Sequence, residues 1–335
     1  MGKSVNVKNF FRILGPIIFV YILSQINYGL FLSELKIIKW PYLALTMLLL
    51  IACILLKSLR WKTVLSALKI DVSRSEAINL YWLGLFVGMI TPGRVGELIK
   101  VYFLKFKGYN FFRSFFSVIF DRLSDVAVVL GLGFIVSWYY FNAISGYIGL
   151  FGAVIALFVI LFFVLSASKS GLHQLLSKIF AKIFMIDKSE YDRFTFDRLW
   201  QGIKSLKKAD VAMFIFYMVL GWLAYFYARY AVAQALDLPL TLNAVIITSV
   251  LIAIVSALPI SVAGLGTREA AVIYAFSLFG LDKEIALLFS LIIFSCDSLV
   301  TSIGLAPYLQ QSYLIDKVKA GGIDEMKISE TEKIS

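Results

Sequence analysis

The chain has 335 residues, of which 60% are hydrophobic and 16% are charged, and its mean hydropathy is +0.87. This composition excludes an ordinary soluble domain and is typical of a membrane protein with several spans. The net charge of +11 would suit a nucleic-acid ligand, but the basic residues first have to be sorted by their place relative to the apolar stretches.

Six apolar stretches reach or approach the length of about 20 residues that a helix needs to cross the hydrocarbon core. They predict transmembrane helices at 10–33, 41–57, 111–138, 143–166, 211–235 and 285–306. The first stretch follows basic residues, as the core of a signal peptide does, but it is too long and no small-residue cleavage site follows it. We therefore expect it to be retained as the first helix.

Two further apolar stretches, 77–91 and 241–258, end in glycine-rich, charged breaks. Each is followed by a second apolar stretch, 95–106 and 268–280 respectively. Irregular backbone at membrane depth is tolerated only where protein or water surrounds it. The two pairs therefore predict re-entrant helical hairpins, with two short spans joined by a surface loop as the alternative in each case.

The distribution of basic residues predicts the orientation. With a cytoplasmic amino terminus and two re-entrant hairpins, the inner segments hold 25 Lys and Arg residues and the outer segments hold Lys36, Lys39 and Lys283. This asymmetry follows the positive-inside rule and removes the need for a nucleic-acid partner. We expect a multi-pass protein of the cell membrane with both termini in the cytoplasm.

Four residues recur after an interval of 172 positions. Glu97, Tyr102, Gly108 and Asp125 are matched by Glu269, Tyr274, Gly280 and Asp297. Three predicted crossings separate the hairpins, so the first would enter from the cytoplasm and the second from outside. The two halves, about 10–140 and 143–310, are therefore expected to form an inverted repeat, as in transporters that bind substrate at the repeat interface.

The predicted fold is an all-α polytopic membrane protein, with six full transmembrane helices and two re-entrant hairpins in one integral domain, 1–310. Within it, 167–210 carries apolar residues at helical spacing. This pattern predicts a cytoplasmic amphipathic insertion that lies on the inner leaflet or packs on the spans. The remainder, 311–335, is a short charged cytoplasmic tail that is expected to be disordered.

Charged side chains inside predicted spans indicate function, because they are rare and costly at that depth. Asp121 and Asp125 share one helical face, with Arg122 alongside, and Asp297 reaches a similar depth in the sixth span. We expect these four residues to form a polar path or a gating network of ion pairs.

The hairpin breaks contain the candidate substrate site. An arginine at the start of each returning helix adds a guanidinium to the helix amino terminus, which favours a phosphate or a carboxylate. Glycine lets a ligand approach the backbone, and the glutamates of the same turns either join the site or neutralise the arginines as structural ion pairs. The residues concerned are Gly93, Arg94, Glu97, Gly266, Arg268 and Glu269.

The sequence predicts no catalytic centre, no metal site and no cofactor. The only histidine, His173, lies in the polar insertion, while Cys53 and Cys296 are single thiols in different spans. Two cysteines are too few for a closed structural zinc site. No complete nucleotide-binding loop is present, so transport would use a gradient, a partner or no energy source.

Three segments resemble the transmembrane region of the lysylphosphatidylglycerol synthases, a flippase-like family. They are Gly88-Met89-Ile90-Thr91-Pro92-Gly93-Arg94-Val95-Gly96-Glu97, Asp121-Arg122-Leu123-Ser124-Asp125 and Gly264-Leu265-Gly266-Thr267-Arg268-Glu269, and Arg60-Trp61 is also similar. The resemblance covers most of 10–310 and implies movement of lipid between leaflets. Since only a short tail follows the last span in this sequence, we expect no fused synthase domain and no aminoacyl transfer.

These observations favour a flippase or scramblase for an anionic or modified phospholipid or a lipid-linked head group. The partners implied are that lipid and, for some relatives, a separate lipid-modifying enzyme or glycosyltransferase. A secondary transporter for a soluble anion could use the same inverted repeat. An intramembrane transferase would instead use an aspartate or glutamate as a general base on a lipid-linked substrate.

Overall fold

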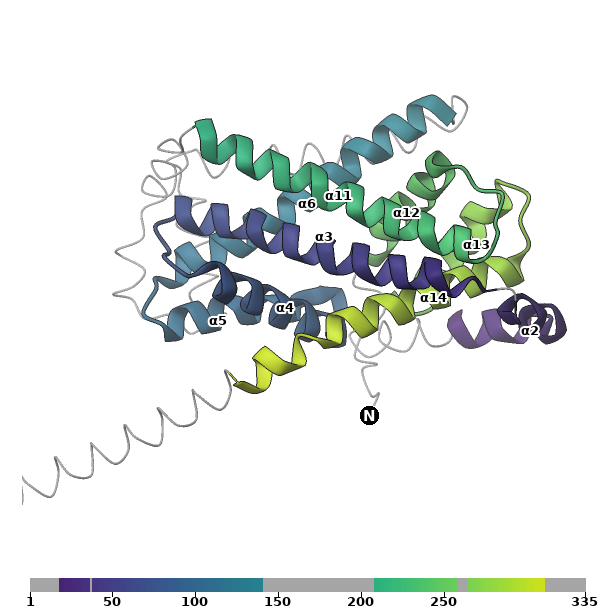
Figure 1. Ribbon diagram of the computed structural model, residues 1–335, viewed down its shortest axis with the longest axis horizontal. Helices are drawn as coiled ribbons and strands as arrows, with labels where there is room; N and C mark the ends of the chain where they lie inside the picture. The colour runs from purple at the N-terminus through teal and green to yellow at the C-terminus, as the bar shows by residue number, and fades with distance from the viewer. Residues whose placement is uncertain (1–17, 37, 141–207, 258–263, 311–335) are drawn as a thin grey trace, which may run out of the picture.

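The computed structural model describes residues 18–36, 38–140, 208–257 and 264–310, and the regular elements in these ranges are all helices (Figure 1). The predicted span 143–166, nearly all of the insertion 167–210 and the tail 311–335 lie outside the described residues.

The predicted first span, 10–33, is wrong as one continuous helix. Residues 18–24 are helical, a turn follows, and α2 (Tyr28–Lys36) begins a new helix. Asn27 Oδ1 accepts hydrogen bonds from the backbone N–H groups of Gly29 and Leu30, at 3.0 and 3.3 Å. A side chain that caps the next helix in this way ends the preceding one, and hydropathy does not reveal it. The Asn27 N–H donates to Glu284 Oε1 at 3.1 Å.

The other described elements fall into two series of the same order. The first series is α3 (Trp40–Ala67), α4 (Arg74–Ile90), the 3-10 helix η1 (Pro92–Leu98), α5 (Ile99–Phe106) and α6 (Phe111–Tyr140). The second series is α11 (Lys208–Ala235), α12 (Leu242–Ala257), α13 (Thr267–Ser277) and α14 (Lys283–Ser302). We call these series the first half and the second half. Their long helices coincide with predicted spans and their short helices with the arms of the predicted hairpins.

Three stretches in the described part of the chain are long and apolar enough to cross a membrane. They are Trp40–Ala67, Lys208–Ala235 and Lys283–Gln310, the last being α14 with its continuation after a turn. Each has 28 residues, so at about 1.5 Å per residue each exceeds a hydrocarbon core of about 30 Å. The total of six spans and the re-entrant nature of the hairpins stay predictions.

The long helices α3 and α11 pack against each other in opposite directions. At one end, the Lys39 N–H donates to Ala235 O at 2.8 Å. Seven residues further along α3, Thr46 Oγ1 donates to Ala228 O at 3.3 Å. Residue numbers therefore rise along one helix as they fall along the other. This antiparallel contact between equivalent helices is the arrangement that an inverted repeat requires.

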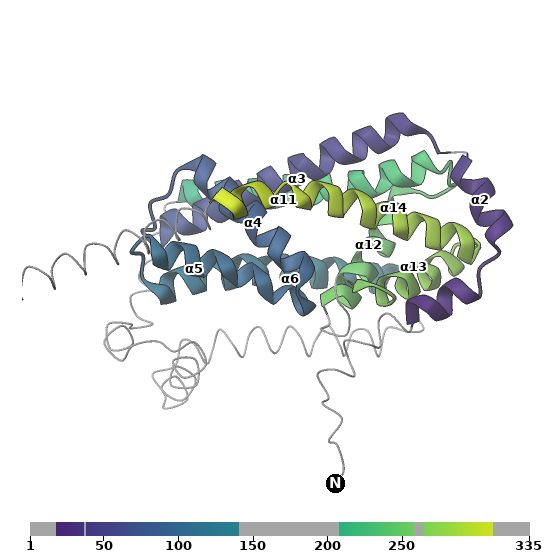
Figure 2. The ribbon, with the colours of Figure 1, turned by 90° about the horizontal axis from the view of Figure 1, so that it is seen from below.

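The arms of each hairpin pack against each other: α4 packs along η1 and α5, and α12 packs along α13. The two hairpins lie toward opposite ends of the long axis of the molecule (Figures 1 and 2). The element η1 also contacts α6 and α12, so the first hairpin reaches the second half.

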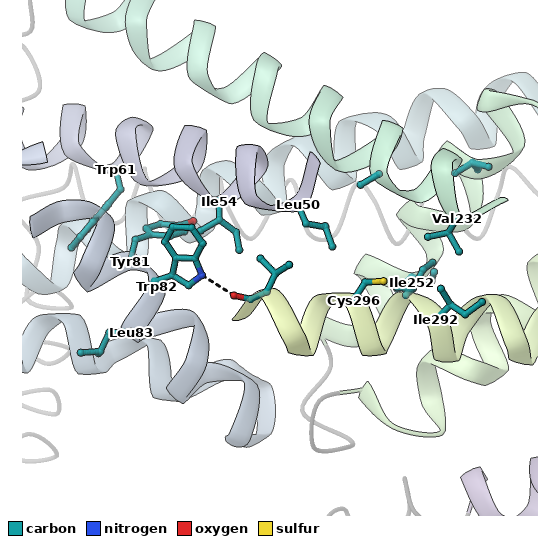
Figure 3. Close-up of a cluster of buried hydrophobic side chains, with 14 of the residues drawn as sticks. Leu50, Ile54, Trp61, Tyr81, Trp82, Leu83, Val232, Ile252, Ile292 and Cys296 are labelled. Carbon is teal, nitrogen blue, oxygen red and sulfur yellow. Dashed lines mark hydrogen bonds between the residues drawn. The ribbon is translucent and has the colours of Figure 1, made fainter. Parts of the chain in front are cut away.

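The halves meet in a buried apolar cluster (Figure 3). Its labelled members include Trp61, Tyr81 and Trp82 from the first half and Val232, Ile252, Ile292 and Cys296 from the second. The indole N–H of Trp82 donates to Val300 O at 2.9 Å, which fixes α4 against the end of α14. Beyond it, Gly304 lies so close that an added Cβ would be 2.3 Å from Trp82 O.

Candidate functional site in the helix core

The two aspartates of α6 are held by basic residues of α3. Arg60 donates from Nε and Nη2 to Asp121 Oδ1, at 3.0 and 2.7 Å, and from Nη1 to Asp125 Oδ1 at 2.7 Å. Lys57 Nζ contacts the other oxygen of Asp125 at 3.2 Å. Arg60 and Asp121 are completely buried. The planar fork of a guanidinium suits this bridging of two carboxylates one helical turn apart.

Tyr81 connects this group to the first hairpin. Its hydroxyl donates to Asp121 Oδ2 at 3.3 Å. Lys100 Nζ lies 4.5 Å from the centre of the Tyr81 ring and 5.0 Å from that of Trp61, in the range of cation–π attraction. The same Nζ is 3.4 Å from Glu97 Oε2, and Lys100 is completely buried. A buried ammonium is therefore held by one carboxylate and two aromatic faces.

Glu97 also forms an ion pair with Arg122 of α6. The side chain of Glu97 is 3% exposed and that of Arg122 is 27% exposed. Neither group is fully satisfied: Glu97 Oε1 and Arg122 Nε are buried atoms with no hydrogen-bond partner among the described residues. We call Lys57, Arg60, Glu97, Lys100, Asp121, Arg122 and Asp125 the first-half network.

Two glycines of α4 provide the space for the hairpin charges. A Cβ at Gly84 would lie 2.9 Å from the side-chain carbons of Lys100, and one at Gly88 would lie 2.7 Å from Glu97 Cγ. The two glycines are one helical turn apart, so they form a continuous hollow on one face of α4. Small residues at this spacing let membrane helices approach closely, and here they receive charged side chains.

In the second half, Asp297 of α14 pairs with Arg229 of α11. The guanidinium donates from Nη1 to Oδ1 at 3.0 Å and from Nη2 to Oδ2 at 2.7 Å. It also lies 4.6 Å from the ring centre of Tyr225. The Arg229 side chain is 4% exposed and that of Asp297 is 37% exposed, so the pair has one buried and one accessible end.

In the second hairpin, groups of the protein itself bind the carboxylate of Glu269. Glu269 Oε2 accepts from the Gly266 N–H at 2.6 Å, and so caps the amino terminus of α13. Its Oε1 forms an ion pair with Arg268 and accepts from Ser290 Oγ at 3.1 Å. Arg268 Nε also donates to Ser290 Oγ at 3.0 Å. Gly266 has φ +81°, a conformation that glycine adopts without strain. We call Arg229, Arg268, Glu269, Ser290 and Asp297 the second-half network.

The first hairpin places Arg94 differently. Arg94 lies beside Gly93 within η1, and α5 begins only at Ile99, so this arginine is not at the start of an α-helix as predicted. It is exposed, with φ +56°, and its guanidinium has no hydrogen bond or ion pair among the described residues. Arg268 is therefore engaged by its neighbouring glutamate, whereas Arg94 is open.

The predicted polar path is divided between the two networks. Asp121 and Asp125 share Arg60, Arg122 turns to Glu97, and Asp297 binds Arg229. Cys53 on α3 is a buried free cysteine. Whether these groups form a path or a gate stays a prediction. In the described part of the chain, no cluster of His, Cys, Asp or Glu could hold a metal ion.

Several basic residues of the networks were missed as site residues. They are Lys57, Arg60 and Lys100. The predicted second span ends at 57 and so leaves Arg60 outside it, whereas α3 continues to Ala67. One signal was available in the sequence. Lys57 and Arg60 are three apart on one helical face, and apolar residues continue beyond them, as expected for charges within a helix.

A protein whose described elements are all helices, with membrane-length apolar helices and ion pairs inside its core, belongs to the class of polytopic membrane proteins. The chain belongs to the family of the lysylphosphatidylglycerol synthase transmembrane region, whose model matches residues 11–304. This confirms the resemblance seen in the sequence. A UPF0104 membrane protein of Pyrococcus horikoshii is 25% identical over 268 residues, which cover 73% of this chain and 79% of the relative. No solved structure matches the chain.

Proposed function

We propose that the protein moves an anionic or modified phospholipid, or a lipid-linked head group, between the leaflets as a flippase or scramblase. The first-half network carries this proposal, because it concentrates charged side chains inside an apolar helical protein of this family. A charged head group that crosses a bilayer loses its hydration and needs polar partners at that depth. A separate lipid-modifying enzyme or glycosyltransferase would supply a modified lipid.

In this proposal, Arg94 and Arg268 engage the head group from the two hairpins. Arg94 is open for such a contact, whereas Arg268 would first have to exchange Glu269 for the ligand. The ion pairs of Asp121, Asp125 and Asp297 would break and re-form as the hairpins move. Such exchange keeps each buried charge compensated at every stage, which limits the cost of the motion.

Reconstitution into proteoliposomes tests the proposal. Labelled phosphatidylglycerol and labelled phosphatidylcholine are placed in the inner leaflet, and their arrival in the outer leaflet is followed for wild type, Arg94→Ala and Arg268→Ala. Lys39→Ala is the matched control, because it removes a cation from an exposed ion pair with Asp237. We expect wild type and the control to move phosphatidylglycerol, and both arginine variants to move it more slowly.

The outcomes separate the competing functions. Wild-type protein that moves no anionic lipid rejects the flippase proposal. Release of an entrapped soluble anion without lipid movement would favour a solute transporter, and recovery of a covalently altered lipid would favour a transferase. Normal lipid movement in both arginine variants would reject only their role in binding the head group.

A further inference from the structure

The two hairpins carry equivalent glutamates in unlike surroundings. Glu269 uses both of its oxygens, on the α13 amino terminus and on Arg268 with Ser290. Glu97 leaves Oε1 unpaired among the described residues. The glutamate of the second hairpin therefore has protein partners for both of its oxygens, whereas the glutamate of the first hairpin does not.

Arg122 shows the same asymmetry. The position 172 residues after it is Phe294, whose ring lies 4.4 Å from the guanidinium carbon of Arg268. The second half therefore has an aromatic side chain where the first half has a cation. Arg122 is partly exposed, and its buried Nε has no partner in the described part of the chain. A buried, unpaired guanidinium N–H costs free energy unless a ligand accepts from it.

The charge balance points the same way. The first-half network contains four cations and three carboxylates, whereas the second-half network contains two of each. The exposed Arg94 of η1 adds a further cation beside the first network, because η1 packs against α6, the helix that carries Arg122. The surplus of positive charge therefore gathers at the first hairpin.

We infer that the first hairpin alone holds the anion site, in which Arg94 and Arg122 together bind a phosphate group and Glu97 holds Arg122 in its absence. Glu97 retains Lys100 when Arg122 turns to the ligand, so no carboxylate is left unpaired. Two guanidinium groups offer the forked donors that phosphate oxygens accept. For a phosphate carried by a lipid, this inference rests on the proposed function. It differs from that proposal because Arg94 shares the ligand with Arg122 and not with Arg268.

Val95 provides a reporter that leaves the site residues intact. It is 62% exposed and adjoins Arg94, whereas Cys53 and Cys296 are both buried. The full chain with Val95→Cys is labelled by a maleimide in detergent, with phosphatidylglycerol, phosphatidylcholine or inorganic phosphate added in a titration. We expect phosphatidylglycerol to slow labelling and phosphatidylcholine to leave it unchanged. Equal rates with the two lipids, and no slowing by phosphate, would overturn the inference.

Substitutions in the reporter background then assign the ligands. Arg94→Gln and Arg122→Gln should each raise the half-protecting concentration of phosphatidylglycerol by about tenfold to hundredfold, as expected for loss of a charge-assisted hydrogen bond. Lys39→Gln, which removes a cation from an exposed ion pair, is the matched control and should leave that concentration unchanged. Arg268→Gln tests whether the second hairpin shares the site. Equal loss in Arg268→Gln and Arg122→Gln would contradict the single site. If gel filtration shows that Arg122→Gln does not fold, Arg122→Lys takes its place. Its half-protecting concentration is then compared with that of the protein that carries Val95→Cys alone.

The two probes also distinguish the source of the phosphate. Protection by inorganic phosphate without protection by phosphatidylglycerol would keep the site but reject the lipid as its ligand. Failure of the proposed function would appear as absent lipid movement in proteoliposomes with the reporter still protected. Failure of the inference would appear as normal lipid movement with protection that does not depend on Arg94 or Arg122.

Discussion

Lys57 and Arg229 lie 172 positions apart, and each forms an ion pair with the aspartate 68 positions further along the chain. The repeat therefore includes an interaction as well as isolated residues. In each half it joins the first long helix to the last one, α3 to α6 and α11 to α14. A comparison that counts only identical residues does not detect the two basic partners, because one is lysine and the other is arginine.

Loss of one partner of the second pair should destabilise the protein. Asp297→Asn leaves Arg229 without its carboxylate, and we expect a loss of about 2 kcal/mol, discounted for the accessible end of the pair. Thermal unfolding in detergent measures the change. The double variant Arg229→Met/Asp297→Asn should recover part of the loss, because it removes the stranded cation, and a further additive loss would contradict this account.

Arg60 should be more sensitive than Arg229, since it is completely buried and holds two aspartates. Arg60→Ala is expected to cost about 3–5 kcal/mol of unfolding free energy. Arg60→Lys should restore little of it, because an ammonium cannot reproduce three forked hydrogen bonds. Lys39→Ala, in an exposed pair, serves as the comparison and should change stability by less than about 1 kcal/mol. Similar losses for Arg60→Ala and Lys39→Ala would refute the structural role of Arg60.

A methyl group in the α4 hollow should disturb the hairpin charges. Gly88→Ala places Cβ against Glu97 Cγ and is expected to destabilise the protein by about 1–3 kcal/mol. Gly131→Ala is the matched helical control, because nothing lies within 4 Å of its added Cβ. That change should be neutral or stabilising by up to about 1 kcal/mol, through helix propensity. Equal melting temperatures for the two variants would contradict the close approach.

The inverted topology makes a prediction about access from the two sides of the membrane. Lys107, just after the first hairpin, and Lys283, just after the second, are both exposed. A membrane-impermeant maleimide should label Lys107→Cys only from the cytoplasmic side and Lys283→Cys only from the outside, in sealed vesicles of known orientation. Labelling of both positions from one side would exclude the predicted inversion.

The long helices were predictable because their apolar runs are long, and α3, α11 and α14 coincide with predicted spans. The ends of helices were less predictable, as α3 shows by continuing past Lys57 and Arg60. Hydropathy scores these charges as a boundary, whereas carboxylates on α6 compensate them inside the fold. Such compensation depends on residues that are distant in sequence.

The aspartates Asp121, Asp125 and Asp297 were identified from their expected depth, but their partners follow from helix packing. The break at Asn27 was hidden for a different reason, since one side-chain oxygen redirects an apolar run without changing its hydropathy. The sequence also does not predict that Arg94 and Arg268 have different surroundings. Two similar sequence breaks form a 3-10 helix in one hairpin and a self-capped α-helix in the other.

The hydrogen bond from Asn27 to Glu284 has a consequence for assembly. With Ile22 and Ile26 packed on Leu287, it joins residues 22–27 to the beginning of α14. The amino-terminal segment thus completes the half to which it does not belong in sequence. Residues 22 to 27 are synthesised early, so they can make these contacts only after α14 has been synthesised.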